Sequence, residues 1–287
     1  MRIVITGANG EVGRGVLEAV AARLPEADLV ATVRDTARAA DLAARGIDVR
    51  PGDFDEPPAL RESFADADLV FINATFFGAE PELRGRLVLN AIRAAAGASR
   101  IVLTSWPDVE RTALPHVSDF AESERVVREA GPAWTILRLG YGIADALARE
   151  VIWASEDGEL VAPAADARAT PASSSDLIDA AAATVIETGH ENACYEITGP
   201  RAIGWPDLAA LAGSLDDRAI KYRAVDDDEY RAYLAPRGLP DQIIDSLLAF
   251  YAEFRSGWFA TPTPVLNELI GREPVDSLEA IRQRIPS

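Results

Sequence analysis

The chain has 287 residues, 48% of them apolar and 26% charged, which is the composition of a soluble globular protein. Asp and Glu outnumber Lys and Arg by 46 to 28, and the net charge of −18 argues against nucleic acid and anionic membranes as partners. The single cysteine, Cys194, excludes an internal disulfide and a cysteine zinc site. No apolar run reaches the roughly 20 residues of a membrane helix. We expect a cytoplasmic monomer or homodimer with a small-molecule substrate and no metal.

The first predicted elements are a strand, a glycine-rich turn and a helix. Residues 2–6 form a short run rich in β-branched residues, which is typical of a buried strand, so we expect no signal peptide. The helix follows over 14–24. Between them, Gly7 allows a tight turn, Gly10 lets the backbone approach a pyrophosphate, and Gly13 lets helix and strand pack closely. The spacing is G-x-x-G-x-x-G, which we interpret as a dinucleotide-binding turn. The alternative is an ordinary turn between a strand and a helix, in which the glycines are needed only for steric reasons.

The second strand, over 28–33, ends at a cation. Dinucleotide folds that bind NAD carry an acidic residue there, whereas this chain has Arg34, with Arg38 one helical turn later. A guanidinium suits a 2′-phosphate, which favours NADP(H) over NAD(H). The alternative is a solvated surface arginine.

A helix over 35–45 and a third strand over 47–50 lead to Asp53 and Phe54. Asp53 is suited to accept from an adenine amino group with Phe54 against the ring. It is equally suited to cap the helix over 57–64.

Three further strands, over 68–74, 100–104 and 133–138, alternate with helices over 82–96 and 119–129. This alternation predicts an α/β fold, a Rossmann-like doubly wound parallel sheet with right-handed crossovers. Phe76 and Phe77 follow the fourth strand on the ligand side, where they either line a pocket or pack under a loop.

The regular alternation of strands and helices ends after Gly142. We expect a helix over 144–153, an irregular segment over 158–168, a helix from 173 to about 187, and a strand over 193–198. A helix over 205–212, a strand over 220–225 and three helical stretches complete the chain. The longest stretch, 240–258, places one apolar face on Ile243, Ile244, Leu247, Leu248, Tyr251 and Phe254. We therefore predict a cofactor-binding domain over 1–143, to which about 173–200 return, and a smaller, mostly helical, discontinuous substrate lid over 144–287.

Several motifs now occur in a characteristic order: Thr6-Gly7-Ala8-Asn9-Gly10-Glu11-Val12-Gly13, Val33-Arg34-Asp35, Gly52-Asp53-Phe54-Asp55, Thr135-Ile136-Leu137-Arg138, and Tyr195-Glu196-Ile197-Thr198-Gly199-Pro200. In these the chain resembles the atypical short-chain dehydrogenase/reductases of the NmrA-like branch. It looks most like type 2 NAD(P)H quinone oxidoreductases and triphenylmethane reductases, and the resemblance spans nearly the whole chain.

The resemblance implies a cofactor path across the ends of the strands. Residues Gly7, Asn9, Gly10, Glu11, Val12 and Gly13 would hold the pyrophosphate. Arg34 would meet the adenosine phosphate, and Asp53 and Phe54 the adenine. The nicotinamide end would be met by Asn73, Ala74, Thr75, Thr104 and Tyr141.

The chain differs from the superfamily pattern at the residues that usually donate a proton to the substrate. The usual Tyr-x-x-x-Lys pair is missing, with His116 and Phe120 at the comparable positions. We therefore consider Ser105 and His116 as catalytic candidates. The alternative for His116, and the more frequent case for a histidine on a loop, is a surface residue, and the alternative for Ser105 is that it closes its strand. Hydride would pass to a flat, electron-poor molecule such as a quinone in a cleft of Phe76, Phe77, Trp106, Phe120, Tyr141 and Trp153.

Two other functions fit the same pattern. The missing pair also suits a redox sensor that binds the dinucleotide and regulates a partner without turnover. A tailoring reductase or isomerase of a biosynthetic pathway is the third possibility. Turnover of NADPH with quinones or dyes separates the first two.

Overall fold

The structure is a computed structural model, and it describes residues 1–74, 81–111, 114, 117–215 and 217–286. The chain divides into two compact units, each of which is taken by itself. Unit 1 comprises Met1–Glu110, Pro115–Leu139 and Ser175–Ile197. Unit 2 comprises Arg111–Leu114, Gly140–Ser174 and Thr198–Ser287. None of the helices in the described ranges has the length and apolarity to cross a membrane.

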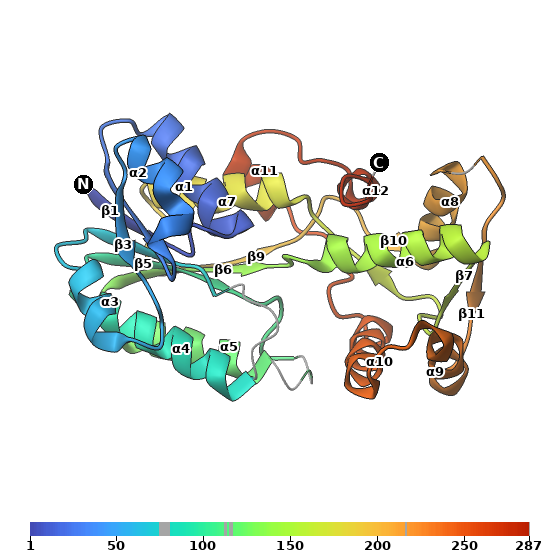
Figure 1. The fold of residues 1–287 in the computed structure, drawn as a ribbon. Coiled ribbons are helices and arrows are strands. Elements are labelled where there is room, and N and C mark those ends of the chain that lie inside the picture. Colours follow the sequence, from blue (N-terminus) through green and yellow to red (C-terminus); the bar gives the residue numbers. More distant parts are fainter. Residues whose placement is uncertain (75–80, 112–113, 115–116, 216, 287) are drawn as a thin grey trace. The chain divides into compact units, whose positions relative to one another are not determined.

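Unit 1 is built on a seven-stranded, all-parallel sheet in the order β3-β2-β1-β4-β5-β6-β9 (Figure 1). Its strands are β1 (Arg2–Thr6), β2 (Asp28–Val33), β3 (Asp48–Pro51), β4 (Leu69–Ile72), β5 (Arg100–Ser105), β6 (Ala133–Leu139) and β9 (Ala193–Ile197). The central strands are buried along their whole length because helices cover both faces of the sheet. The order of the first six strands is that of a Rossmann fold, which confirms the predicted fold class.

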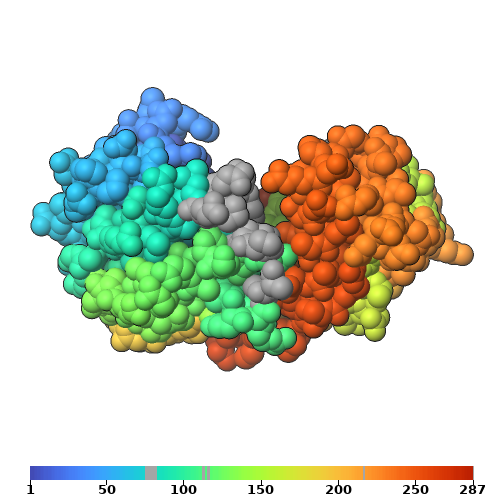
Figure 2. All heavy atoms as spheres, turned by 90° about the horizontal axis from the view of Figure 1, so that it is seen from below, coloured from blue at the N-terminus to red at the C-terminus, as the bar shows by residue number. Residues whose placement is uncertain are grey.

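Helices cover this sheet on both faces. They are α1 (Glu11–Arg23), α2 (Ala40–Ala44), α3 (Pro57–Ser63), α4 (Pro81–Ala94), α5 (Ser118–Glu129) and α7 (Ser174–Ile186). In Figure 1, α1 and α7 lie on one face and α3, α4 and α5 on the other. Figure 2 shows α3, α4 and α5, in cyan to green, as the surface of unit 1 seen from below. The expected helix over 35–45 is divided, because a 3₁₀ turn (η1, Thr36–Ala39) precedes α2.

Unit 2 holds most of the second half of the chain. Its elements are α6 (Ile143–Asp157), β7 (Glu159–Ala162), β8 (Arg168–Ala169), β10 (Ile203–Gly204), α8 (Trp205–Leu215), β11 (Lys221–Ala224), α9 (Asp227–Leu234), α10 (Asp241–Arg255), α11 (Val265–Ile270) and α12 (Ser277–Arg282). Buried aromatic rings form much of its core, and the Tyr251 ring contacts those of both Trp205 and Tyr230.

Three sequence expectations for this half are wrong. The segment 158–168 is not irregular throughout: β7 pairs in parallel with β11, and β8, which begins at Arg168, pairs with β10, whereas residues 163–167 between them are irregular. Four α-helices, not three, follow β11 in the described part of the chain. Ile243, which was expected on the buried face of α10, is 47% exposed, whereas Ile244 is buried.

A carboxyl group lies inside the core of unit 2. Glu150 on α6 is 5% exposed and accepts a hydrogen bond of 3.1 Å from the Tyr230 hydroxyl. Burial removes water from the charged form, and this raises the pKa of Glu150 to about 7.

Candidate functional site

The loop between β1 and α1 is anchored to the sheet by its own backbone. The amides of Gly7 and Ala8 both donate to the carbonyl of Thr32, at 3.0 and 3.4 Å. The amide of Gly10 donates to the carbonyl of Gly7 at 2.9 Å. Gly7 has a φ of +68°, a backbone conformation that favours glycine. The loop is therefore a fixed turn at the carboxyl end of the first strand.

Gly10 and Gly13 face different surroundings. A Cβ on Gly13 would lie 2.4 Å from the Gly7 carbonyl oxygen and 2.5 Å from that of Thr6, so only glycine lets α1 approach β1 this closely. A Cβ on Gly10 would find only the Gly7 carbonyl, at 3.4 Å, and Gly10 is exposed. Gly10 is also the N-cap of α1 and places no side chain over the first-turn amides. This open, uncapped helix start fits a diphosphate.

Two threonine hydroxyls fix the neighbouring strand ends. Thr6 accepts a hydrogen bond from the Asn73 amide at 2.9 Å, and Thr104 accepts one from the Ala74 amide at 2.7 Å. The ends of β1, β4 and β5 are thereby tied together where the nicotinamide half of the cofactor was expected. Thr75, expected beside them, lies outside the described residues.

The end of β2 presents the predicted cations. Arg34 and Arg38 are exposed, and neither has an ion pair within the described part of the chain. The Asn9 side chain donates to the carbonyl of Asp35 at 3.0 Å and so joins the glycine loop to this turn. Arg14 is engaged differently, since it pairs with Glu18 at 2.8 Å and with Asp41.

Asp53 does not cap the following helix, so that alternative is wrong. Its carboxylate accepts from the Asp55 amide at 3.0 Å, whereas the N-cap of α3 is Glu56, which makes no side-chain cap. Phe54 is half-buried, and its carbonyl accepts from the Asn90 side chain at 2.9 Å. Their contact with adenine remains a prediction.

Trp106 and Phe120, two aromatic residues of unit 1 that were predicted to line the substrate cleft, pack against each other. The rings of Trp106 and Phe120 are 6.0 Å apart, and their residues are only 6% and 7% exposed. The Arg84 guanidinium lies 5.0 Å from the Phe120 ring and is fixed by Asp119 at 2.7 Å. Phe120 is therefore a packing residue of α4 and α5. Phe76, Phe77 and His116 lie outside the described residues.

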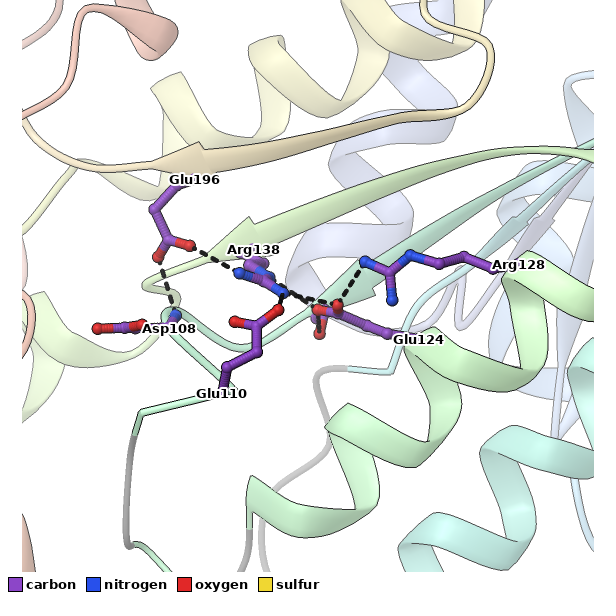
Figure 3. Close-up of polar contacts among 7 residues, drawn as sticks. Asp108, Glu110, Glu124, Arg128, Arg138 and Glu196 are labelled. Carbon is purple, nitrogen blue, oxygen red and sulfur yellow. Dashed lines mark hydrogen bonds and ion pairs between the residues drawn. The ribbon is translucent and has the colours of Figure 1, made fainter.

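Ser105 belongs to a polar group that the sequence analysis did not anticipate. It is here called the Arg138 cluster and consists of Ser105, Asp108, Glu110, Glu124, Arg128, Arg138 and Glu196 (Figure 3). Ser105, Arg138 and Glu196 are register partners on β5, β6 and β9. They form a polar row across three adjacent strands, near the carboxyl ends where open α/β sheets bind ligands.

Glu124 of α5 is the main acceptor of the Arg138 cluster. Its carboxylate is buried, and it accepts from Arg138 through Nε at 2.9 Å and through a terminal nitrogen at 2.8 Å. It also accepts from Arg128 at 2.9 Å and from the Ser105 hydroxyl at 2.7 Å. Because the one hydroxyl proton of Ser105 is directed at Glu124, Ser105 offers other partners only its lone pairs. This weakens the expectation that Ser105 donates to a substrate oxygen.

Glu196 is another carboxylate of the same cluster that contacts Arg138. It accepts from the Asp108 amide at 3.0 Å and meets Arg138 at a longer 3.4 Å. Burial raises the pKa of Glu196 to about 7, and Arg138 only partly opposes this effect. Glu110, which is largely solvated, differs: its contact with Arg138 lowers the pKa of that carboxyl.

The remaining two predicted residues belong to unit 2. Tyr141 is half-buried and precedes Gly142, the N-cap of α6. Trp153 on α6 has the guanidinium groups of Arg149 and Arg237 at 5.4 and 4.9 Å from its ring centroid. Arginines therefore already contact this ring within its own unit. The roles of Tyr141 and Trp153 toward a ligand stay predictions.

Comparison with known proteins agrees with this geometry. A family model described as NAD(P)H-binding matches residues 7–186. Quinone oxidoreductase 2 of Escherichia coli is 29% identical over 97% of each chain, and an NmrA-like family domain-containing oxidoreductase of Aspergillus flavus is 26% identical over 99% of this chain and 94% of its own.

Solved structures share the fold over nearly the full length. The NADPH complex of the Escherichia coli quinone oxidoreductase has a TM-score of 0.89 at 28% identity, covering 99% of each chain. The NADP(H) complex of a Citrobacter triphenylmethane reductase has a TM-score of 0.91 at 23% identity, covering 99% of this chain and all of its own. The predicted NmrA-like branch and the prediction of an NAD(P)H-dependent oxidoreductase are thus confirmed. Because the family model matches more than half of this chain, the chain belongs to the NAD(P)H-binding family.

Proposed function

We propose that the protein is an NADPH-dependent reductase of flat, electron-poor small molecules such as quinones or related carbonyl and imine compounds. The observation that carries the proposal is the open start of α1, where Gly10 leaves the first-turn amides uncovered and Gly13 holds the helix against β1. The names of the relatives support the substrate class, since they include a quinone oxidoreductase and a triphenylmethane reductase.

In this proposal the residues of unit 1 bind and orient. The amides at the start of α1 bind the diphosphate, and Arg34 meets the 2′-phosphate. Thr6 and Thr104 hold the strand ends beneath the nicotinamide half through the Asn73 and Ala74 amides. The bound NADPH supplies the hydride. Phe120 occupies the place of the usual lysine and packs against Trp106, so this position holds no proton donor.

The test is turnover by the purified protein. We expect calorimetry to detect NADPH binding, and we expect 1,4-naphthoquinone to accelerate the loss of NADPH absorbance. Binding without turnover across a panel of quinones and cationic triphenylmethane dyes would favour the redox-sensing alternative. Failure to bind NADPH would reject the proposal altogether.

A further inference from the structure

The turn that follows β2 is tied to the glycine loop at two points. The first tie is made by the backbone, since the amide of Gly7 donates to the carbonyl of Thr32 at 3.0 Å. The second is made by a side chain, since Nδ2 of Asn9 donates to the carbonyl of Asp35, also at 3.0 Å. Arg34 lies between these two carbonyls in the sequence, so its backbone is held from both sides.

The carbonyl oxygen of Asp35 also shapes the turn that carries the second arginine. It accepts a further hydrogen bond, of 3.3 Å, from the backbone amide of Arg38. The carboxylate of Asp35 accepts from the amide of Ala37 at 3.0 Å and so caps the η1 turn. The Asn9 side chain therefore bonds to the same peptide group that orders this turn. Arg34 and Arg38 project from it, both exposed and both without an ion pair in the part of the chain that the structure describes.

The two cofactors differ in how much they depend on this tie. NADPH carries phosphate at two places, the diphosphate and the 2′-phosphate of the adenosine ribose, and NADH carries only the diphosphate. Two phosphates of one molecule can be bound together only where the glycine loop and the arginines stand at the matching separation. A separation that is fixed before binding costs less ordering entropy than one that the ligand must impose. NADH has no group that needs the arginines.

We propose that Asn9 is a positioning residue for cofactor choice, whose side-chain amide holds Arg34 and Arg38 at the distance from the glycine loop at which NADPH binds in preference to NADH. The inference rests on the proposed function, in which Arg34 meets the 2′-phosphate. The family resemblance implies a direct contact of Asn9 with the pyrophosphate. The two roles have different consequences, because a contact with the pyrophosphate would serve NADPH and NADH alike.

Calorimetry with both cofactors separates the two roles. Asn9→Ala removes the bond to Asp35, and alanine fits there because Asn9 is exposed and its φ is not positive. We expect the variant to bind NADPH about 3- to 10-fold more weakly, the effect of one hydrogen bond, and to bind NADH as the wild type does. Equal losses for NADPH and NADH would overturn the positioning role.

Asn90→Ala is the matched control. It removes a bond of the same kind, from an asparagine side chain to the carbonyl of Phe54 at 2.9 Å, also within unit 1. Phe54 is expected at the adenine, which both cofactors share. The ratio of NADPH to NADH affinity should therefore stay at the wild-type value in Asn90→Ala and fall in Asn9→Ala.

A double-mutant cycle shows whether Asn9 acts through the arginines. In a variant that lacks both guanidiniums, Arg34→Ala with Arg38→Ala, the further change Asn9→Ala should leave NADPH affinity unchanged. A side chain that contacts the diphosphate directly would still contribute in this background. A further loss of affinity there would therefore overturn the proposal.

Hydrogen exchange without cofactor tests the tie itself. In Asn9→Ala, deuterium uptake over residues 34–38 should rise, and uptake by β2 should stay at the wild-type level. Unchanged uptake over 34–38 would overturn the role of Asn9. Wild-type protein that binds NADPH but reduces no acceptor would reject the reductase function alone, because the binding and exchange measurements on Asn9 do not need turnover. Wild-type protein that does not bind NADPH would reject both.

Discussion

At the scale of single residues, Gly10 and Gly13 serve different purposes, and substitution separates them. Gly13→Ala forces a methyl group to within 2.4 Å of a backbone oxygen, and we expect a loss of about 1–3 kcal/mol in the free energy of unfolding. Gly10→Val meets no such obstacle in the protein and should fold, yet its side chain would occupy the place of the diphosphate. Denaturation and NADPH calorimetry on both variants check this. Unchanged NADPH affinity in folded Gly10→Val would place the phosphates elsewhere.

Arg34 should determine the choice between the two cofactors. It is exposed at the end of β2 and has no ion pair within the described ranges, so its guanidinium is available to a phosphate. Loss of one charge-assisted contact costs about 1.5–3 kcal/mol, so Arg34→Ala should weaken NADPH about 10- to 100-fold and leave NADH nearly unchanged. Arg61→Ala, an exposed arginine on α3, is the control. Equal losses for both cofactors would contradict the assignment.

The predictability of the site varied from residue to residue. The role of the glycine loop could be predicted because it depends only on the spacing of three glycines between one strand and the next helix. The Arg138 cluster could not, because Arg138 closes an apolar strand and its partners are distant in sequence. One signal was available: a polar or charged residue is the last or the last but one of each of three adjacent strands, at Ser105, Arg138 and Glu196. Their adjacency becomes visible only once the strand order is known.

At the scale of elements, Phe120 packs α5 against Arg84 of α4 and against Trp106, the residue that follows β5. Since this ring is buried between Trp106 and Arg84, Phe120→Ala should lower the free energy of unfolding by about 3–5 kcal/mol. Phe120→Leu should recover much of the loss. A substrate contact would behave differently: the KM for 1,4-naphthoquinone would rise while the melting temperature stayed constant. We expect the first pattern.

Strands, too, could be predicted where their own sequence identifies them, and not where they depend on a partner far along the chain. The strands of unit 1 are apolar runs bounded by turn residues and were located to within a few residues. The strands β7 and β8 were missed because they lie in a segment rich in Ala and Pro, and their partners β11 and β10 lie far along the chain. Ile243 was assigned to the buried face by helical spacing, yet that face of α10 is narrower than the pattern implied.

At the scale of the whole molecule, stability should depend on pH through Glu150. Its pKa is about 7 in the folded protein, against about 4.3 in an unfolded chain. The folded state therefore binds more protons between these values, and its stability falls as pH rises through this window. The full loss, reached above the folded pKa, is about 4 kcal/mol.

Denaturation at several pH values measures this dependence. Glu150→Gln retains an acceptor for the Tyr230 hydroxyl and cannot ionise, so its stability should vary less with pH than that of the wild type. Glu196→Gln is a useful comparison because Glu196 contributes with the same sign but is less buried. A Glu150→Gln variant that keeps the full wild-type slope would show that this carboxyl is ionised in the folded protein.

The threonine hydroxyls near the carboxyl ends of β1 and β5 have a consequence for amide hydrogen exchange. The Asn73 and Ala74 amides lie beyond the end of β4, where exchange is ordinarily fast, yet each donates to a buried threonine oxygen. Both should exchange slowly with deuterium, and Thr6→Val and Thr104→Val should each release one amide without changing the other. These two protons would therefore report separately on how often each strand junction opens.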